Sequence, residues 1–385
     1  MKSLLNRLQG DKVIWFVVAF MSLFSLLAVY SSTGTLAYRF QAGNTEYYLI
    51  RHSVIMILGL LLMYFAHKIK YTYYSRISQL ALFVAVPLLL LTLLMGTNIN
   101  EANRWLTLPV INVTFQSSDF AKLALIMYIA RILTKKQGQI KDFKASFLPV
   151  ILPVMIVCAL ILPANLSTAL ILFATSIVLM FIGRISLKYI FAMIAIGVVF
   201  LSIFLVVLLN SPETGRFYTW KSRIERFVDR ENADTYQSDQ AKIAIATGGI
   251  AGKMPGNSVQ RNFLPQAYSD FIFAIIVEEY GLIGGFTVVM LYLILLFRGV
   301  RIAHRSPGTF GAFLAAGLTF SLVFQAMINM AVSVDLLPVT GQPLPLLSMG
   351  GTSLWFTSLA IGIILSVSRK VEEVNQQEGG EHVAV

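Results

Sequence analysis

The sequence predicts an all-α polytopic integral membrane protein with about ten transmembrane helices. Hydrophobic residues make up 57% of the 385-residue chain, and charged residues make up only 13%. The mean hydropathy is +0.74, and the apolar residues form long uninterrupted runs. This composition excludes an ordinary soluble domain.

Each apolar run of roughly 15 to 25 residues is long enough to cross a membrane once. The fourth and the tenth runs are short, so we expect these two spans to include flanking residues or to lie tilted. The first run follows a basic start, as in a signal peptide, but it is long and lacks a small-residue cleavage site, which favours a retained span. The predicted spans are Val13–Tyr30, Tyr48–Ala66, Ile77–Met95, Phe120–Leu133, Phe147–Leu162, Ser167–Ile182, Tyr189–Leu209, Phe271–Phe297, Phe310–Ala331 and Leu354–Val367.

Lysine and arginine residues cluster between alternate spans, and such clusters stay on the cytoplasmic side of a membrane. This rule predicts that both termini are cytoplasmic and that residues 210–269 form a large extracytoplasmic loop between the seventh and eighth spans. We expect residues 1–371 to form a single polytopic membrane domain. The polar tail, residues 372–385, is predicted to be disordered.

The net charge of +11 does not indicate nucleic-acid binding, because the basic residues lie in short clusters between apolar runs. Such clusters are typical of cytoplasmic loops that contact anionic membrane lipids. The only cysteine, Cys158, lies inside an apolar run, and the four histidines are dispersed. The sequence therefore predicts neither a disulfide framework nor a protein-built metal site.

The first polar loop contains Arg104 and Trp105 and leads through residues 117–119 into a helix. One interpretation is structural, with the tryptophan at the membrane interface and a Ser or Asp side chain capping the helix. The other makes Arg104 a donor to an anionic headgroup. Asp119 and Lys122 are three residues apart and share a helix face, so we expect an ion pair that allows the lysine to enter the membrane.

In the large loop, four cations alternate with aromatic residues. This pattern is typical of an amphipathic helix at the outer leaflet, and it would equally suit a pyrophosphate-binding surface. A glycine-rich run at 248–253 is not a Walker A motif, because Thr247 stands at the position of the first glycine and Met254 follows the lysine. We expect its glycines to allow tight turns or close backbone approach. The four cations are Arg216, Lys221, Arg223 and Arg226.

One stretch joins a polar cluster directly to a membrane helix. Arg261 is followed by Ser269 and Asp270, and a long apolar run begins at the next residue. A carboxylate there could cap the helix N-terminus, or it could take part in chemistry, and the residue pattern leaves both interpretations open. Glu278 and Glu279 lie about two turns further along, and at least one should face the helix bundle, because a lipid-facing carboxylate is costly.

The last loop breaks the apolar pattern with many prolines and glycines. Gln325 and Asn329 precede it, and residues 337–353, which include Ser348, contain the densest group of these residues. Irregular backbone at membrane depth is tolerated only where it is buried in protein or lines a wet cavity. The sequence therefore predicts a re-entrant or pore-lining segment between the last two spans.

These motifs resemble the SEDS family of bacterial cell-wall proteins over nearly the whole chain. The combination of YSDFIFAIIVEEYG with LPVTGQPLPLLSMGG is highly specific, and GNSVQ at Gly256–Gln260 is more similar to the division branch than to the elongation branch. The chain departs from the usual family pattern at several positions. Asp119 stands in place of Glu, Ser117 in place of Pro, Asn165 and Ser167 in place of Asp and Gly, and Met349 in place of Tyr.

The resemblance implies a peptidoglycan glycosyltransferase that polymerises lipid II outside the cytoplasmic membrane, at the division septum. It also implies a class B penicillin-binding protein and other division proteins as partners, and it makes Asp270 the catalytic carboxylate. We expect Asp270 to act as general base and cations at 104, 216, 221, 223 and 261 to stabilise the leaving undecaprenyl pyrophosphate. A divalent cation, Mg²⁺ or Mn²⁺, is an alternative source of that charge. Rival hypotheses are a lipid II flippase, an elongation-type polymerase of the same family, and a membrane scaffold for the transpeptidase.

Overall fold

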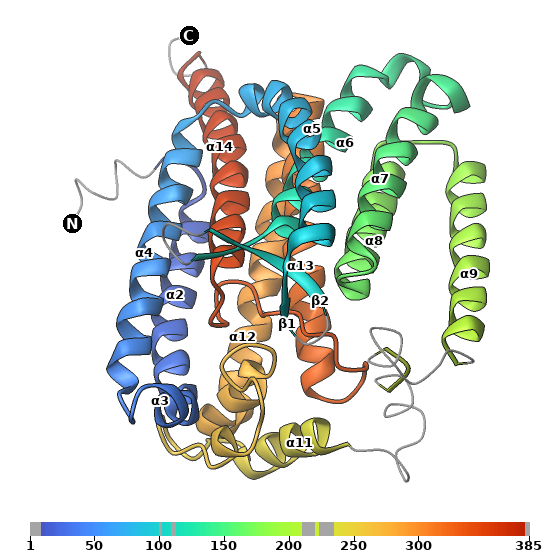
Figure 1. Cartoon of the computed structure of the whole chain (residues 1–385). Coiled ribbons are helices and arrows are strands. Elements are labelled where there is room, and N and C mark those ends of the chain that lie inside the picture. Colours follow the sequence, from blue (N-terminus) through green and yellow to red (C-terminus); the bar gives the residue numbers. More distant parts are fainter. Residues whose placement is uncertain (1–8, 100–101, 109–112, 210–219, 223–234, 382–385) are drawn as a thin grey trace.

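A computed structural model describes residues 9–99, 102–108, 113–209, 220–222 and 235–381 (Figure 1). Its main elements are long helices that run roughly side by side. The α-helices are α2 (Lys12–Ser32), α3 (Gly34–Phe40), α4 (Thr45–Lys68), α5 (Tyr71–Met95), α6 (Ser117–Lys135), α7 (Leu148–Ile161), α8 (Leu166–Ile182), α9 (Leu187–Leu209), α11 (Tyr236–Gly248), α12 (Ile272–Arg305), α13 (Thr309–Ser333) and α14 (Thr352–Glu381).

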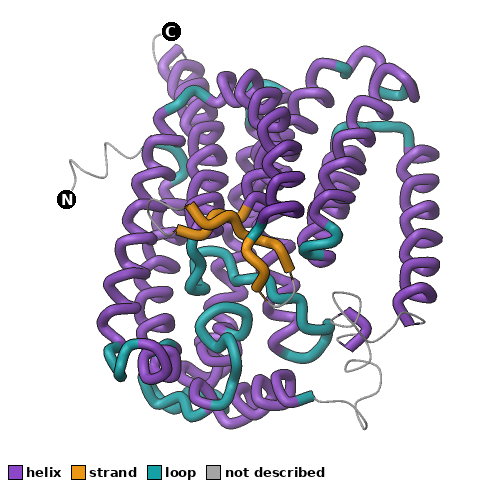
Figure 2. The backbone as a smooth tube through the Cα atoms, in the orientation of Figure 1, coloured by secondary structure: helices purple, strands orange, loops and turns teal. Residues whose placement is uncertain are grey.

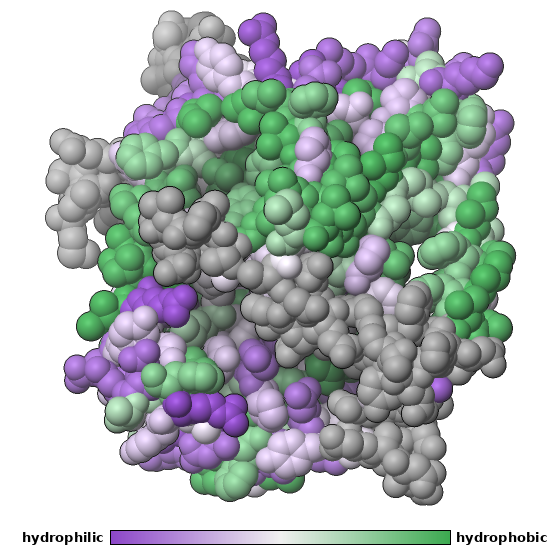
Figure 3. All heavy atoms as spheres, viewed as in Figure 1, coloured by the Kyte–Doolittle hydropathy of each residue, from purple (hydrophilic) through white to green (hydrophobic). Residues whose placement is uncertain are grey.

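Each predicted span coincides with one of these helices, which confirms the polytopic helical fold. Eight of the helices in the described part are long and apolar enough to cross a membrane. The short apolar helix α8 and the charged helix α6 account for the other two predicted spans. Figure 3 shows an apolar belt of side chains between two more polar ends, as expected for a protein that is solvated by lipid around its middle.

A small three-stranded antiparallel sheet was not predicted. Its strands are β1 (Thr97–Ile99), β2 (Ala102–Leu108) and β3 (Val113–Gln116), in the order β1-β2-β3. Trp105 pairs with Gln116 across β2 and β3. Figure 2 shows these strands near the middle of the molecule, among the ends of the helices.

The start of α2 and the end of α14 lie at the same end of the bundle. Asp11 forms an ion pair with Arg298 on α12, with Oδ2 2.5 Å from Nη2, and its backbone N–H donates to Ser368 Oγ over 2.8 Å. Figure 1 shows α3 and α11 at the opposite end. The chain therefore has two distinct polar ends, and the first one joins α2, α12 and α14.

The last helix, α14, continues to Glu381, past residue 372, where the tail predicted to be disordered begins. Two charged pairs follow the helical spacing in this region. Arg369 lies 3.6 Å from Glu373 at i,i+4, and Lys370 lies 3.2 Å from the same carboxylate at i,i+3. Such pairs each stabilise a helix by roughly 0.2–0.5 kcal/mol, so the polar composition does not end the helix.

Small residues allow α4 and α14 to pack closely. A Cβ added at Gly362 would lie 2.5 Å from Met63 O, and a Cβ added at Gly59 would lie 2.7 Å from Leu354 Cδ2. Close backbone approach is the usual way in which helices associate in lipid, where no hydrophobic force drives them together. This packing fixes the start of α14, which borders the site described below.

Candidate functional site

Asp270 lies two residues before the first residue of α12. Phe271, not Asp270, occupies the N-cap position, and its side chain makes no capping hydrogen bond. The half-buried carboxylate of Asp270 accepts a hydrogen bond from Ser269 Oγ over 3.0 Å. Asp270 is thus presented by the turn that precedes the helix.

Three consecutive backbone carbonyl groups, at residues 268–270, are held by donors from distant parts of the chain. Two donors lie in the irregular segment before α14, and the third lies on α13. They are Met349 N to Tyr268 O (2.9 Å), Ser348 Oγ to Ser269 O (2.5 Å) and Asn329 Nδ2 to Asp270 O (2.8 Å). The backbone that carries the carboxylate is consequently fixed at every residue.

The irregular segment is itself held at several points, as expected for buried non-helical backbone. Asn329 Nδ2 also donates to Gln342 O over 2.7 Å, and Gln342 Nε2 donates to Thr168 Oγ1 on α8 over 2.8 Å. Tyr292 on α12 donates its hydroxyl to Pro345 O. Buried side chains such as Leu344 fill the space around it. This agrees with the prediction of a segment buried in protein.

A cavity of about 360 Å³ lies beside Asp270, within the size range of small-molecule sites. Asp270 is the only carboxylate among the described residues that line it. Most other polar groups there are neutral amides and hydroxyls, and an aromatic ring, Trp105, adds a flat apolar wall. The polar lining includes Gln116, Asn165, Gln237, Gln266, Tyr268, Ser269, Thr352 and Ser353.

Tyr268 contributes a neutral hydroxyl next to this carboxylate. Burial, the negative charge of Asp270 and the neighbouring Tyr48 all raise the pKa of Tyr268 above its ordinary value. The phenol therefore stays protonated at neutral pH and can donate a hydrogen bond. The cavity thus pairs one acceptor carboxylate with neutral donors.

The predicted cations are not brought together around Asp270 by the described residues. Arg216 and Arg223 lie outside the described residues, as does Arg226, and Arg104 lies in β2 with its side chain outside the described part. Lys221 follows Trp220, whose ring packs 5.4 Å from that of Phe204. The predicted amphipathic helix in this loop also falls mostly outside the described residues.

Arg261 is fixed elsewhere. Its Nη1 donates to Ser31 O over 3.0 Å and to Ser31 Oγ over 3.1 Å. It lines a second cavity, which is bordered by α3 and residues 261–268, and not the cavity beside Asp270. Arg261 is thus close to Asp270 in sequence, but its side chain lines a different cavity.

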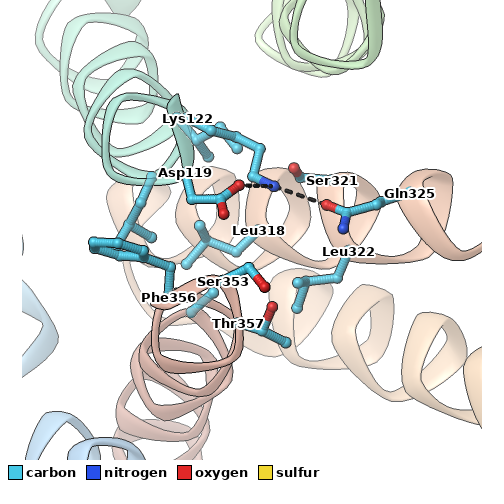
Figure 4. Close-up of a pocket in the computed structure, with 12 residues that line it drawn as sticks. Asp119, Lys122, Leu318, Ser321, Leu322, Gln325, Ser353, Phe356 and Thr357 are labelled. Carbon is cyan, nitrogen blue, oxygen red and sulfur yellow. Dashed lines mark hydrogen bonds and ion pairs between the residues drawn. The ribbon is translucent and has the colours of Figure 1, made fainter. Parts of the chain in front are cut away.

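Asp119 and Lys122 form the predicted ion pair on α6, with Nζ 3.3 Å from Oδ1. Figure 4 shows both side chains pointing toward Gln325 of α13, whose Oε1 accepts from Lys122 Nζ over 2.8 Å. Gln325 also donates to Pro343 O over 2.9 Å. The pair is therefore connected to the segment that holds residues 268–270. The alternative of capping by Ser or Asp is not supported, because α6 begins at Ser117 without a side-chain cap.

Glu278 and Glu279 are both buried, and both act on the loop before the site. Glu278 accepts from Lys253 Nζ over 2.7 Å and from Ser258 Oγ over 2.5 Å. Glu279 accepts from Ser31 Oγ on α2. These contacts join α12 to the preceding loop and to α2. The burial of both carboxylates agrees with the expectation that at least one faces the interior.

The glycine-rich run packs against a break in α12. Gly281 has φ 68° and ψ −168°, which interrupts the helix. A Cβ at Gly281 would lie 2.1 Å from Ile250 O, and one at Gly248 would lie 2.2 Å from Val277 O. This confirms that the glycines allow close backbone approach, because no larger residue fits between the two backbones.

No group of three or more His, Cys, Asp or Glu side chains that could hold a metal ion occurs in the described part of the chain. A cation beside Asp270 would find a single protein carboxylate among the described residues of the cavity. Mg²⁺ sites of that kind take most of their ligands from substrate phosphates and water.

Several site residues were missed at the sequence level, namely Gln342, Thr168, Tyr268 and Tyr292. Thr168 and Tyr292 are polar residues in apolar runs, whereas Tyr268 and Gln342 lie in loops, and neither setting reveals the partner. Gln342 bonds Thr168, Tyr292 bonds Pro345 O, and the backbone oxygen of Tyr268 accepts from Met349 N, all far away in the sequence.

Comparisons with known proteins show the family of the chain. The model of the cell cycle protein family FtsW/RodA/SpoVE matches residues 11–373. A protein of Trichlorobacter lovleyi named "Probable peptidoglycan glycosyltransferase FtsW" is 35% identical over 368 residues, covering 94% of this chain and 93% of its own. The stage V sporulation protein E of Bacillus subtilis is 31% identical over 375 residues, covering 94% of this chain and 98% of its own.

Two solved structures share the fold. A chain of a peptidoglycan synthase complex, described for polymerization and crosslinking, superposes with a TM-score of 0.75 at 24% identity, over 94% of this chain and 98% of that chain. The rod shape determining protein RodA of Thermus thermophilus superposes with a TM-score of 0.66 at 24% identity, over 94% and 98%. With the family match over most of its length, the chain belongs to the FtsW/RodA/SpoVE family of cell cycle proteins.

Proposed function

We propose that this protein is a peptidoglycan glycosyltransferase that polymerises lipid II at the outer face of the cytoplasmic membrane during septal wall synthesis. The observation that carries the proposal is Asp270, a carboxylate on a backbone fixed at three successive carbonyls and facing a cavity of about 360 Å³. Relatives named "Probable peptidoglycan glycosyltransferase FtsW", at 34% to 35% identity, support the reaction class.

In this mechanism Asp270 is the general base. It takes the proton from the 4-hydroxyl of the acceptor's N-acetylglucosamine as that oxygen attacks C1 of the donor's N-acetylmuramic acid. The new C1–O bond forms while the bond from C1 to the pyrophosphate oxygen breaks, and the electron pair leaves with undecaprenyl pyrophosphate. In-line attack inverts the configuration at C1.

A fixed base is useful here because both substrates are large and lipid-anchored. Holding the reacting oxygen and C1 in one orientation lowers the entropic cost of reaching the transition state. A misplacement of about 1 Å costs roughly a hundredfold in rate. The grip on residues 268–270 by Ser348, Met349 and Asn329 supports this part of the proposal. The protonated Tyr268 hydroxyl is a donor for a sugar oxygen in the same cavity.

The leaving pyrophosphate needs positive charge, and the described lining of the Asp270 cavity contains no lysine or arginine. We assign that charge to the loop cations Arg216, Lys221 and Arg223, together with Arg104, or to a Mg²⁺ or Mn²⁺ ion held chiefly by the pyrophosphate oxygens. Arg261 lines the neighbouring cavity instead. Pre-placed cations stabilise charge that develops in the transition state.

The proposal includes orientation and partners. Both termini face the cytoplasm, so that the end carrying α3 and α11 and the cavity beside Asp270 face the periplasmic side, where lipid II is polymerised. A class B penicillin-binding protein cross-links the product, with other division proteins in the same assembly. The relative found in a peptidoglycan synthase complex supports such a partner.

The direct test uses the purified protein with its partner and labelled lipid II. We expect Asp270→Asn to lose polymer formation while it keeps its helical content and partner binding. Glu46→Gln, which changes an exposed carboxylate at the start of α4, is the matched control. Liposomes that contain labelled lipid II test the flippase alternative, because movement of the headgroup without glycan formation would favour transport.

A further inference from the structure

The second cavity, lined by Arg261, is separate from the one beside Asp270. Its volume is about 590 Å³. The α3 helix and the end of α2 form one wall, and residues 261–268 form the other. Figure 1 shows α3 at the end of the bundle opposite the start of α2. The cavity therefore belongs to the end of the protein that also carries α11.

The walls of this cavity are bonded to one another. Thr35 Oγ1 donates to Arg261 O over 2.8 Å, and Arg261 Nη1 donates back to Ser31 on α2. Arg261 Nε is buried and has no hydrogen-bond partner in the described part of the chain. The wall thus holds the Arg261 guanidinium in a fixed place, where it also interacts with the buried carboxylate of Glu279.

The two cavities share a border. Gln266 and Tyr268 line both of them, and Asp270 follows Tyr268 by only two residues. The two cavities therefore lie next to each other, close enough for a long ligand with its reacting end beside Asp270 to place its neighbouring units at the second cavity. A compact ligand would have no use for this proximity.

The lining chemistry suits an anionic saccharide. Two arginines, Arg39 and Arg261, line the cavity, and no carboxylate occurs among its described lining residues. Aromatic rings such as Phe263 offer flat apolar faces, while the amides of Asn262 and Gln266 can bond hydroxyl groups. An arginine fork matches a carboxylate. A phospholipid headgroup would bind the arginines but would make no specific contacts with the amides and the aromatic rings.

We propose that the second cavity binds the glycan strand already made, at the sugars next to the reacting one, with the arginines on the carboxylates of the peptide stems. This inference rests on the proposed polymerase function and deepens it. The cavity keeps the strand on the enzyme between additions, so it sets product length. Disrupting it should shorten the strands more than it slows lipid II consumption.

The first test is product length. Arg39→Glu combined with Phe263→Ala changes two exposed positions of the lining, which limits the effect on folding. We expect mean strand length on labelled lipid II to fall at least threefold, and more than the rate of lipid II consumption falls. Tyr38→Ala is the control, because Tyr38 is 80% exposed on the same helix and does not line the cavity. Unchanged length, or an equal fall in rate and length, would overturn the assignment.

The second test measures binding without catalysis. The probe is an uncross-linked glycan tetrasaccharide with its peptide stems, added to the full-length Asp270→Asn protein. We expect saturable binding that is lost when Arg39→Glu and Phe263→Ala are added, and no competition from phosphatidylglycerol nanodiscs. Equal displacement by that lipid would identify a headgroup site instead. Because binding needs no turnover, this result stands apart from failure of the base role.

Discussion

Replacing Asn329 tests whether the hydrogen bonds to the backbone carbonyls of residues 268–270 matter for the reaction. Its amide is 1% exposed and donates to two backbone carbonyls, Asp270 O over 2.8 Å and Gln342 O over 2.7 Å. Asn329→Ala leaves both carbonyls without this donor. Each buried unsatisfied group costs about 1–3 kcal/mol, so the two together cost about 2–6 kcal/mol.

Part of that cost should appear in the polymerisation rate. An increase of about 1.4 kcal/mol in the activation free energy slows the reaction about tenfold. A shift of the carboxylate by about 1 Å slows it roughly a hundredfold. We therefore expect Asn329→Ala to lower the polymerisation rate by about 10- to 100-fold. Asn329→Asp should be at least as harmful, because a carboxylate oxygen would face a carbonyl oxygen.

The assay is polymer formed per unit time from labelled lipid II, together with the melting temperature of the purified protein in detergent. Asn257→Ala is the matched control, because that asparagine is exposed and its side chain donates to Lys253 O, away from residues 268–270. A normal rate for Asn329→Ala at a normal melting temperature would refute the reasoning. The hydrogen bond from Asn329 to Asp270 O would then not be needed to position the base.

Two further predictions concern stability. Gly281→Ala should destabilise the protein by at least about 1–3 kcal/mol, because φ is 68° and the new Cβ would lie 2.1 Å from Ile250 O; a melting temperature equal to the wild type would contradict the close approach. Lys122→Met should cost about 3–5 kcal/mol by leaving Asp119 buried without its partner, whereas Lys370→Met, in an exposed pair with Glu373, should cost at most about 1 kcal/mol. Equal melting temperatures for these two variants would contradict the burial of the first pair.

The helices could be predicted because the signal is local. An apolar run long enough to span lipid has almost no alternative to a helix, since every backbone group must be satisfied within the segment. The small sheet gave no such signal, because its strands are short and lie between helix ends. The tail was predicted from composition, but Glu373 forms ion pairs at helical spacing that support α14.

Asp270 could be found from the sequence because a carboxylate at the end of an apolar run is conspicuous. What makes it a plausible base was not accessible, since the donors to residues 268–270 come from Asn329 and from Ser348 and Met349, about 60 to 80 residues later in the chain. Arg261 shows the converse limit. It is close to Asp270 in sequence, yet its guanidinium is bonded to Ser31 beside a different cavity.

The central claim is that Asp270 removes the proton from the attacking hydroxyl. The most direct measurement is the initial rate of glycan formation from labelled lipid II by Asp270→Asn with its transpeptidase partner, compared with the wild type and with Glu46→Gln. General base catalysis contributes about 10²- to 10⁴-fold, so we predict a loss of at least about a hundredfold for Asp270→Asn and a normal rate for Glu46→Gln. Polymer formation by Asp270→Asn at the wild-type rate would contradict the account.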